Sequence, residues 1–449
     1  MNLTDKFVEN LYNFSKRDFT KEEEIHAKKC LLDYIGVTIA GAKAYHGVES
    51  TLLGTCLAEG GNSIVIGHPK KSSVPVAALI NGISAHAVEL DDGQRFGNVH
   101  PGAPVISALL SVAEHNCLSI SSIWKGLLTG YECTLRLACS IQPSHKLKGF
   151  HATGPCGTIG ATMAIAAMLN YSKEQFKAAL SVACTSASGI LEMIEGDTQL
   201  MPYNSGKAAS NAVVAAFVGL SNFKYPEDAL GGKRGFLNCF SDHPNLDILT
   251  DFSDKTYCTT NYFKIYAACG HCHASIDAAL NLRKEHIFSV DEIESIDIQT
   301  YQLALRGHDH NVIDGVNSAR MSIPYSTAVA LAHGSADIED FDEQTICNQQ
   351  LLQLTSKITV RENVELTKQA PAKRIAIVSV HTNKGDFTET ITFPKGQPEN
   401  PLSLDDIESK FRKYAAWGGL SKNIIDRVFS MIIQPDSDHT VGELMCCLQ

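Results

Sequence analysis

This chain has fewer positively charged than negatively charged side chains. Its 449 residues include 38 lysines and arginines against 49 aspartates and glutamates, which gives a net charge of -11. A protein that binds nucleic acid or an anionic membrane surface needs a basic face to neutralise phosphates, so this balance argues against both as partners. An anionic small molecule is still compatible with the composition if a few cations gather locally.

Long hydrophobic runs are also lacking. Residues 1–24 alternate charged with apolar side chains and contain no leader-like hydrophobic stretch. The longest uncharged segment, 149–172, contains His151, Pro155 and Asn170, which suit a helix buried in protein better than one facing lipid. We therefore expect a cytoplasmic protein without a membrane partner, and its 14 cysteines as free thiols.

Internal repeats and low-complexity linkers are absent, yet the chain is longer than the roughly 250–300 residues at which a single core stops growing. Two domains are the expectation. Up to about residue 260 the sequence is dominated by alanine-rich patterns with helical spacing. The helices predicted there are 22–40, 74–90, 104–114, 121–140, 157–170, 173–188 and 206–220.

Strand patterns appear only in the later part of the chain. After a helix at 275–285, the predicted strands are 293–301, 374–382 and 388–393, the last two joined at the turn residues 383–385. Amphipathic helices return at 404–416 and 422–431 and would dock on the first domain. The predicted fold is mainly α: a large all-helical domain plus a smaller α/β (α+β) domain.

A cluster of ionisable residues lies between two apolar helical segments. Residues 86–100 contain His86, Glu89, Asp91, Asp92, Arg95 and His100. Acids and bases held between apolar walls are typical of a reaction site, although a solvated loop would also be charged. Adjacent side chains on a helix point about 100° apart, so at most one of the two aspartates should face a cleft.

Two predicted helix starts carry a basic side chain. His151 precedes the helix that follows Gly154, and Lys207 falls in the first turn of a helix predicted from 206. A helix N-terminus attracts anions, so both positions suit a substrate carboxylate. As alternatives, His151 would cap the helix or fill the core, and Lys207 would have a structural role.

The segment Cys269-Gly-His-Cys272-His273 matches the C-x-x-C-H pattern of c-type haem attachment. Such attachment occurs outside the cytoplasm, which conflicts with the absence of an export signal. A zinc site needs about four ligands, and no second C-x-x-C pair is present. The preferred interpretation is that His273 faces a pocket while the two cysteines pack against it or line it.

A last cluster lies at residues 318–325. Arg320 is suited to hold a carboxylate in bidentate fashion and Tyr325 to donate a proton, although a tyrosine after a proline also suits packing at a helix start. Upstream, residues 308–310 read His-Asp-His, which would suit a metal, but a solvated loop is the simpler interpretation.

Taken in order, these motifs resemble the MmgE/PrpD family over essentially the whole chain. The segments that carry the resemblance are HAVELDD with HPGAP, GFHATG, GKAASNA, KIYAACGHCH, SARMSIPY and KGQPENPLSLDDIESKF. The family includes 2-methylcitrate dehydratase, cis-aconitate decarboxylase and iminodisuccinate epimerase. The resemblance implies a homodimer whose helical domain comprises residues 1–262 and 396–449, with a lid domain at 263–395 and the site between them.

The resemblance also places individual site residues. The matching positions are Glu89, Asp91, Asp92, His100, His151, Lys264, His273 and Tyr325. Three positions depart from the cis-aconitate decarboxylases: Gly93 replaces a threonine, Ser210 a lysine and Cys269 a histidine. These departures favour another member of the family's reaction classes.

We therefore expect a lyase that uses neither cofactor nor metal and dehydrates a small hydroxylated di- or tricarboxylate of the 2-methylcitrate type. The alternatives are an epimerase of a small dicarboxylate, such as iminodisuccinate, and a cis-aconitate-type decarboxylase. A further interpretation is a non-enzymatic metal or haem protein. The expected catalytic residues are His100, His151, Asp91, Asp92 and Tyr325. The expected substrate-binding residues are Glu89, Arg95, Lys207, Lys264, His273 and Arg320.

Overall fold

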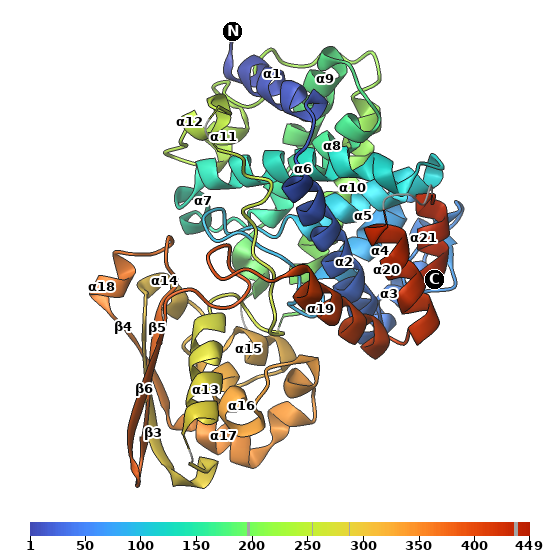
Figure 1. Ribbon diagram of the computed structural model, residues 1–449. Coiled ribbons are helices and arrows are strands. Elements are labelled where there is room, and N and C mark those ends of the chain that lie inside the picture. The colour runs from blue at the N-terminus through green and yellow to red at the C-terminus, as the bar shows by residue number, and fades with distance from the viewer. Residues whose placement is uncertain (195–197, 254, 287, 435–438) are drawn as a thin grey trace.

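The computed structural model describes residues 1–449 except 195–197, 254, 287 and 435–438. A helical part occupies most of the molecule, and a part built on a four-stranded sheet projects from one end of it (Figure 1). The elements of the helical part are α1 (Leu3–Lys16), α2 (Lys21–Ala44), α3 (His46–Leu53), β1 (Ser63–Ile64), β2 (Lys71–Ser72), α4 (Val74–His86), α5 (Gly102–His115), α6 (Ile120–Ile141), α7 (Ser144–Leu147), α8 (Thr153–Met168), α9 (Lys173–Ser186), α10 (Met201–Val218), α11 (Phe236–Phe240) and α12 (Asp247–Thr250).

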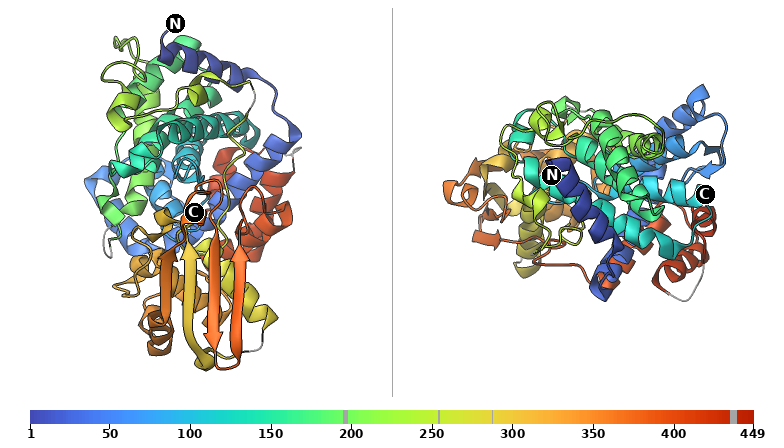
Figure 2. Two further views of the ribbon diagram at one scale, coloured as in Figure 1. Left: turned by 90° about the vertical axis from the view of Figure 1, so that its left-hand side faces the viewer. Right: turned by 90° about the horizontal axis from the view of Figure 1, so that it is seen from above.

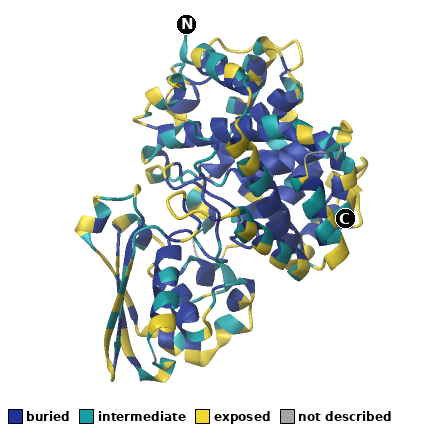
Figure 3. Cartoon of the chain, in the orientation of Figure 1, coloured by how far each residue is buried: buried dark blue, intermediate teal, exposed yellow. Residues whose placement is uncertain are grey.

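Helix α8 is the centre of the helical part. Every residue from Thr153 to Met168 is buried, and α5, α6, α9 and α10 pack around it (Figure 3). Small residues make this packing close: a Cβ added to Gly160 would clash with Thr134 Oγ1 and lie 2.8 Å from the Gly130 carbonyl oxygen on α6. Most of the uncharged segment 149–172 is therefore a core helix, as predicted. Among the described residues, no helix is both long enough and apolar enough to cross a bilayer.

The sheet has the strand order β4-β3-β5-β6, with β3 and β4 parallel and the other pairs antiparallel (Figure 2). Helices α13, α16 and α17 cover one face of it (Figure 1). The elements of this sheet part are α13 (His273–Glu285), β3 (Ile293–Thr300), α14 (Gln302–Leu305), α15 (Val316–Met321), α16 (Ile323–His333), α17 (Gln349–Ser356), β4 (Ile358–Glu362), α18 (Val364–Thr367), β5 (Ala376–Thr382) and β6 (Gly385–Ile391). The predicted fold class, mainly α with a smaller α/β part, is confirmed.

The last helices return to the helical part. They are α19 (Leu404–Trp417), α20 (Lys422–Ile433) and α21 (Val441–Cys447), and α19 lies along α2. The approach is close, because a Cβ added to Gly36 would lie 3.0 Å from the Cα of Phe411. We propose that residues 1–262 and 396–449 act as one unit and 263–395 as another.

Some element boundaries differ from the prediction. The helix predicted at 74–90 ends at His86, because Glu89 has φ +55°, which an α-helix cannot accommodate. Helix α10 begins at Met201, so Lys207 lies in its second turn rather than its first. Strand β4 and helix α1 had no counterpart in the prediction.

Candidate active site

A cavity of about 100 Å³ lies where the helical part meets the sheet part. The loops after α4 and before α8 line it from one side, and the segment before α13 together with the residue Arg374, just before β5, lines it from the other. Its ionisable lining residues are Glu89, His100, Lys146, His151, Tyr262, Cys269, His271, His308 and Arg374. We call Glu89, His100 and His151 the helical wall, and Cys269, His308 and Arg374 the sheet wall.

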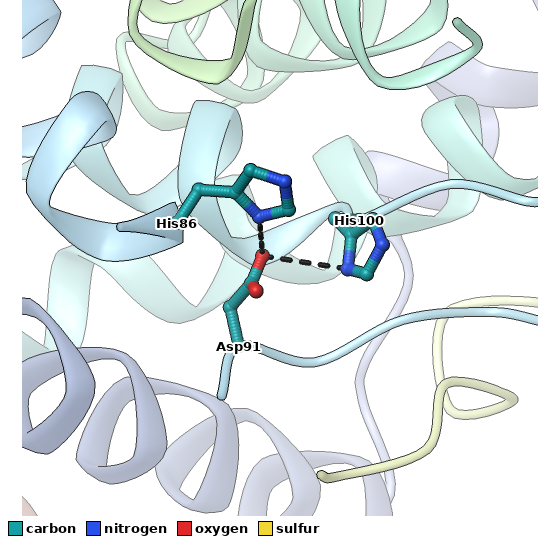
Figure 4. Close-up of side chains that lie close together, drawn as sticks. All are labelled: His86, Asp91 and His100. Atoms are coloured by element: carbon teal, nitrogen blue, oxygen red, sulfur yellow. Dashed lines mark hydrogen bonds and ion pairs between the residues drawn. The ribbon is translucent and has the colours of Figure 1, made fainter. Parts of the chain in front are cut away.

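Asp91 lies behind the helical wall, between two histidines (Figure 4). Its Oδ2 atom is 2.7 Å from His86 Nδ1 and 3.4 Å from His100 Nδ1. His86 and Asp91 are buried, whereas His100 is partly exposed to the cavity. A turn follows α4, in which Glu89 N–H donates to the His86 carbonyl oxygen at 3.4 Å and Glu89 has φ +55°, so Asp91 lies beside His86 without continuing the helix.

A buried ion pair adjoins this cluster. Lys264 Nζ donates to Glu89 Oε2 at 2.6 Å and lies 4.0 Å from Asp91 Oδ1. The other carboxylate oxygen of Glu89 is 3.5 Å from His86 Nε2. Two carboxylates therefore face a lysine and a histidine, so the charges of this group balance inside the protein.

Burial and these neighbours set the protonation states. Burial would raise the pKa of Asp91, but the charges of His86 and His100 outweigh burial and hold that pKa well below its ordinary value. Burial would lower the pKa of His86, but Asp91 and Glu89 raise it, which favours the charged ring. Burial lowers the pKa of His100 to about 4 despite the nearby Asp91, so His100 is neutral at neutral pH. Burial also lowers the pKa of His151 well below its ordinary value.

Hydrogen bonds assign different roles to the two neutral histidines. His100 Nδ1 donates to the carbonyl oxygen of Asp92 at 2.8 Å, which leaves Nε2 as a proton acceptor. Asn204 Nδ2 approaches His151 Nδ1 at 3.5 Å, and Lys207 holds the same amide by donating to Asn204 Oδ1 at 3.1 Å. Nδ1 of His151 is thus the acceptor, and its Nε2 carries the proton. One histidine presents a proton acceptor and the other a hydrogen-bond donor.

Cations face the same cavity. Among the residues that the structure describes, neither Arg374 nor Lys146 forms an ion pair with a carboxylate. Arg374 Nη2 donates only weakly, to the Arg95 carbonyl oxygen at 3.2 Å and to Asn98 Oδ1 at 3.3 Å. Burial lowers the pKa of Lys146 to about 8. These two side chains are available to bind the carboxylates of a small molecule.

The His86, Asp91 and His100 ligand atoms lie within 4.8 Å of one another, a spacing that would also suit a metal ion. The hydrogen bonds favour a different interpretation. Nδ1 of His86 and Nδ1 of His100 are the atoms nearest Asp91, and each carries a proton that it donates to oxygen, so neither Nδ1 offers a lone pair to a metal. Lys264 also places positive charge beside Asp91. The arrangement therefore favours proton transfer over metal binding.

Comparisons with known proteins agree with this architecture. The MmgE/PrpD N-terminal domain profile matches residues 6–249 and the MmgE/PrpD C-terminal domain profile matches residues 266–427. The chain belongs to the MmgE/PrpD family. Curated relatives include a cis-aconitate decarboxylase-like protein, oryM, from Aspergillus oryzae, which is 25% identical over 94% of this chain and 92% of its own length. The cis-aconitate decarboxylases of Mus musculus and Homo sapiens are 25% and 24% identical, over 92% of this chain in both cases and over 87% and 88% of their own lengths.

Gly93 has a structural reason to lack a side chain. A Cβ at this position would lie 2.5 Å from the hydroxyl oxygen of Tyr262, which lines the cavity. The backbones of the two residues are also paired, with Gly93 N–H donating to the Tyr262 carbonyl oxygen at 3.0 Å. In this member of the family, an aromatic ring takes the space that a side chain at position 93 would occupy.

Several residues predicted for the site lie elsewhere. Asp92 points away from the cavity and accepts from Gly102 N–H and from Asn261 Nδ2, and burial raises its pKa to about 8. Of the two aspartate carboxylates, only that of Asp91 contacts the histidines of the cluster, and both residues follow the end of α4 instead of lying on a helix as the prediction assumed. Arg95 forms an ion pair with Glu399 outside the cavity.

The aromatic and basic residues predicted within the sheet part are structural in this conformation. Tyr325 is buried in the core of that part, and its hydroxyl donates to the Asp340 carbonyl oxygen at 2.9 Å. His273 is buried, with Nε2 3.3 Å from the Ala268 carbonyl oxygen. Arg320 donates to the Ala87 carbonyl oxygen at 2.9 Å. These three, with Lys207, do not reach the cavity wall, because backbone carbonyls or packing satisfy them first.

Sequence reasoning missed Arg374, Lys146, Tyr262 and His271 as lining residues, and it interpreted His308 as part of a solvated loop. Lys146 lies five residues before His151, so its proximity to that motif was an available signal. Arg374 directly precedes a strand, and nothing in its local sequence distinguishes it from a solvated charge.

Proposed function

We propose that this protein is a cofactor-independent lyase that dehydrates a small hydroxylated di- or tricarboxylate of the 2-methylcitrate type. One observation carries the proposal: two neutral histidines in opposite tautomers share a small cavity with Arg374 and Lys146, which have no carboxylate partner among the described residues. The cations suit the carboxylates of the substrate, and the histidines suit a reaction that removes one proton and supplies another.

In the proposed step, His100 Nε2 takes the proton from the carbon next to a carboxylate. The bond from the neighbouring carbon to its hydroxyl breaks, and the hydroxyl leaves as water with the proton that His100 took, while His151 Nε2–H donates a hydrogen bond to the departing oxygen. Negative charge that develops on the carboxylate is stabilised by Arg374 and Lys146. Asp91 keeps the His100 ring oriented and stabilises the positive charge that the ring acquires. The product is an α,β-unsaturated carboxylate.

Decarboxylation is the second candidate, because the relatives named above are cis-aconitate decarboxylases or resemble one. In that reaction carbon dioxide leaves, the electron pair stays on the carbon and one donor, His151, supplies the proton. An epimerase would return a proton to the opposite face of the same carbon. The position at which cis-aconitate decarboxylases have a lysine is Ser210 here, and Lys207 donates to the Ser188 carbonyl oxygen instead of reaching the cavity. This difference favours dehydration.

Proton NMR in deuterated water separates these reactions. The purified protein is incubated with citrate, 2-methylcitrate, isocitrate, cis-aconitate and aspartate-derived dicarboxylates. New alkene signals from a hydroxy acid support dehydration. Loss of carbon dioxide from cis-aconitate would instead show that the reaction is a decarboxylation. Deuterium uptake without a new skeleton would indicate an epimerase. A protein that is inactive on every acid, as His100→Asn is expected to be, would contradict the proposed substrate class.

We also propose a homodimer whose interface includes one face of α10. Tyr203, Val214 and Phe217 are large, exposed and on a single side of this helix, and Leu220 extends the patch beyond its end. Apolar patches of this kind mark protein interfaces. Sedimentation should give twice the chain mass, and Phe217→Asp should shift it to one chain mass. A native protein that sediments as a single chain at high concentration would contradict the dimer.

A further inference from the structure

Cys269 and His308 lie next to each other on the sheet wall. Cys269 Sγ is 4.0 Å from His308 Nε2, and both residues line the cavity. His308 Nδ1 donates to the Met321 carbonyl oxygen at 3.0 Å, so the lone pair of Nε2 faces the thiol. A thiol beside a base that a third group orients is the arrangement of an activated nucleophile.

The two cysteines of the C-x-x-C motif have opposite environments. Burial would raise the pKa of Cys269, but the charge and the hydrogen bond of His308 outweigh it and lower the pKa to about 7. Cys272 is fully buried, with Sγ 3.8 Å from the Met321 carbonyl oxygen, and burial raises its pKa well above the ordinary value. Because the thiolate is the nucleophile, Cys269 should be reactive and Cys272 inert.

Nearby cations would select what reaches this thiol. The Arg374 guanidinium lies beside the residue that follows Cys269, since a Cβ at Gly270 would be 3.3 Å from Arg374 Nη1. Lys146 lines the same cavity. A carboxylate bound to either cation would hold the rest of its molecule close to Cys269.

We propose that Cys269 and His308 form a nucleophilic dyad that captures electrophilic carboxylates bound in the cavity, α,β-unsaturated carboxylates above all. The capture of product rests on the proposed dehydration, which makes a molecule of that class. His308 takes the thiol proton, and the sulfur forms a bond to the β-carbon. The electron pair of the double bond moves to the α-carbon, which takes the proton from His308. The net change is addition of S–H across the double bond.

The first test compares iodoacetate, an anion, with iodoacetamide, its neutral counterpart, on the full-length protein. In this reaction the S–C bond forms and iodide leaves. Peptide mass spectrometry should find Cys269 alkylated before exposed cysteines such as Cys56, with iodoacetate at least about tenfold faster than iodoacetamide, because a cationic cleft concentrates anions. Arg374→Gln should abolish the preference for the anion, and citrate should protect Cys269. Equal rates for the two reagents, or labelling of Cys56 first, would overturn the proposal.

Matched variants isolate the dyad. His308→Asn should slow alkylation of Cys269 by both reagents, whereas His310→Asn should not, because His310 contacts Ser318 away from the cavity. Cys272→Ala should leave the labelling of Cys269 unchanged. Circular dichroism of each variant shows whether it folds. If Cys269 in the folded His308→Asn variant were labelled at the native rate, His308 would not be the base that activates Cys269.

The second test uses cis-aconitate as an unsaturated carboxylate that needs no prior turnover. The native protein should gain the mass of one whole acid at Cys269, and Cys269→Ser should gain none. Anion-selective labelling without turnover of any hydroxy acid would support the dyad and contradict dehydration. Turnover with no adduct on Cys269 would support dehydration and overturn capture of unsaturated acids.

Discussion

The helical wall and the sheet wall treat charge in different ways. In and behind the helical wall, the carboxylates of the cluster have cationic neighbours: Asp91 lies between two histidines, and Glu89 accepts from Lys264. On the sheet wall, Arg374 and His308 interact with carbonyl oxygens and an amide rather than with a carboxylate. The first wall is internally neutral and fixes proton positions, whereas the second leaves positive charge for a ligand. This difference predicts that changes in the helical wall affect turnover and changes in the sheet wall affect binding.

The largest effect is expected at His100. His100→Asn removes the proton acceptor, so kcat should fall by about 10²–10⁴-fold with little change in KM, because general base catalysis contributes that much. NMR assays of initial rates measure both constants. His115→Asn, on an exposed helix end, is the control and should keep native rates. A folded His100→Asn variant with more than about a tenth of native kcat would show that His100 is not the base.

Arg374 should show the converse pattern. Arg374→Gln removes a charge-assisted contact to a substrate carboxylate, so KM should rise roughly 10- to 100-fold, which corresponds to the usual 1.5–3 kcal/mol of such a bond. The fall in kcat should be smaller. Arg361→Gln is the matched control, because Arg361 pairs with Asp297 on the exposed sheet. If Arg374→Gln lowered kcat and left KM unchanged, the division of roles between the walls would be wrong.

The pH dependence should follow the lowered pKa of His100, which is about 4. A general base acts in its neutral form, so activity is retained above its pKa and lost as the pH falls through it. The value of kcat/KM should therefore stay level down to about pH 5, and not decline near ~6.5 as for an unperturbed histidine. Circular dichroism at each pH separates this limb from unfolding. A decline centred near 6.5 in folded protein would assign the base to another histidine.

The smallest effect is expected at Tyr325. Tyr325→Phe removes the hydrogen bond to the Asp340 carbonyl oxygen, so the free energy of unfolding should fall by about 1 kcal/mol. Its kcat should stay within about twofold of native, since the hydroxyl does not reach the cavity. Urea denaturation and the NMR assay measure the two quantities. A large loss of kcat in the folded variant would mean that Tyr325 reaches the substrate during turnover.

What the sequence predicted well was local. Glu89, Asp91 and His100 lie within one short stretch, so their spacing indicates a shared cluster, whereas the place of His151 beside them came from the family resemblance. Helical periodicity likewise identified the helical part and the return of the last helices, because an apolar stripe repeats every few residues whatever it packs against.

The features that the sequence could not predict depend on contacts between residues far apart in the chain. Arg374 joins the cavity from the segment just before β5, far along the chain from His100, and no local pattern records that approach. Arg320 and Tyr325 had the right chemistry for a site, but the carbonyl oxygens of Ala87 and Asp340 take up their hydrogen bonds. Which side chains will form hydrogen bonds with backbone carbonyl oxygens, and so be unable to bind a substrate, cannot be predicted until the fold is known.

The cavity draws its walls from segments as distant in the chain as Glu89 and Arg374, and this has a consequence for the order of folding. Helices close over a few residues and form fast, whereas contacts between distant segments wait for long loops to close. On dilution from denaturant, the helical circular dichroism signal should therefore recover before turnover does. In a cell, a newly made chain would acquire its shape before it acquires its chemistry.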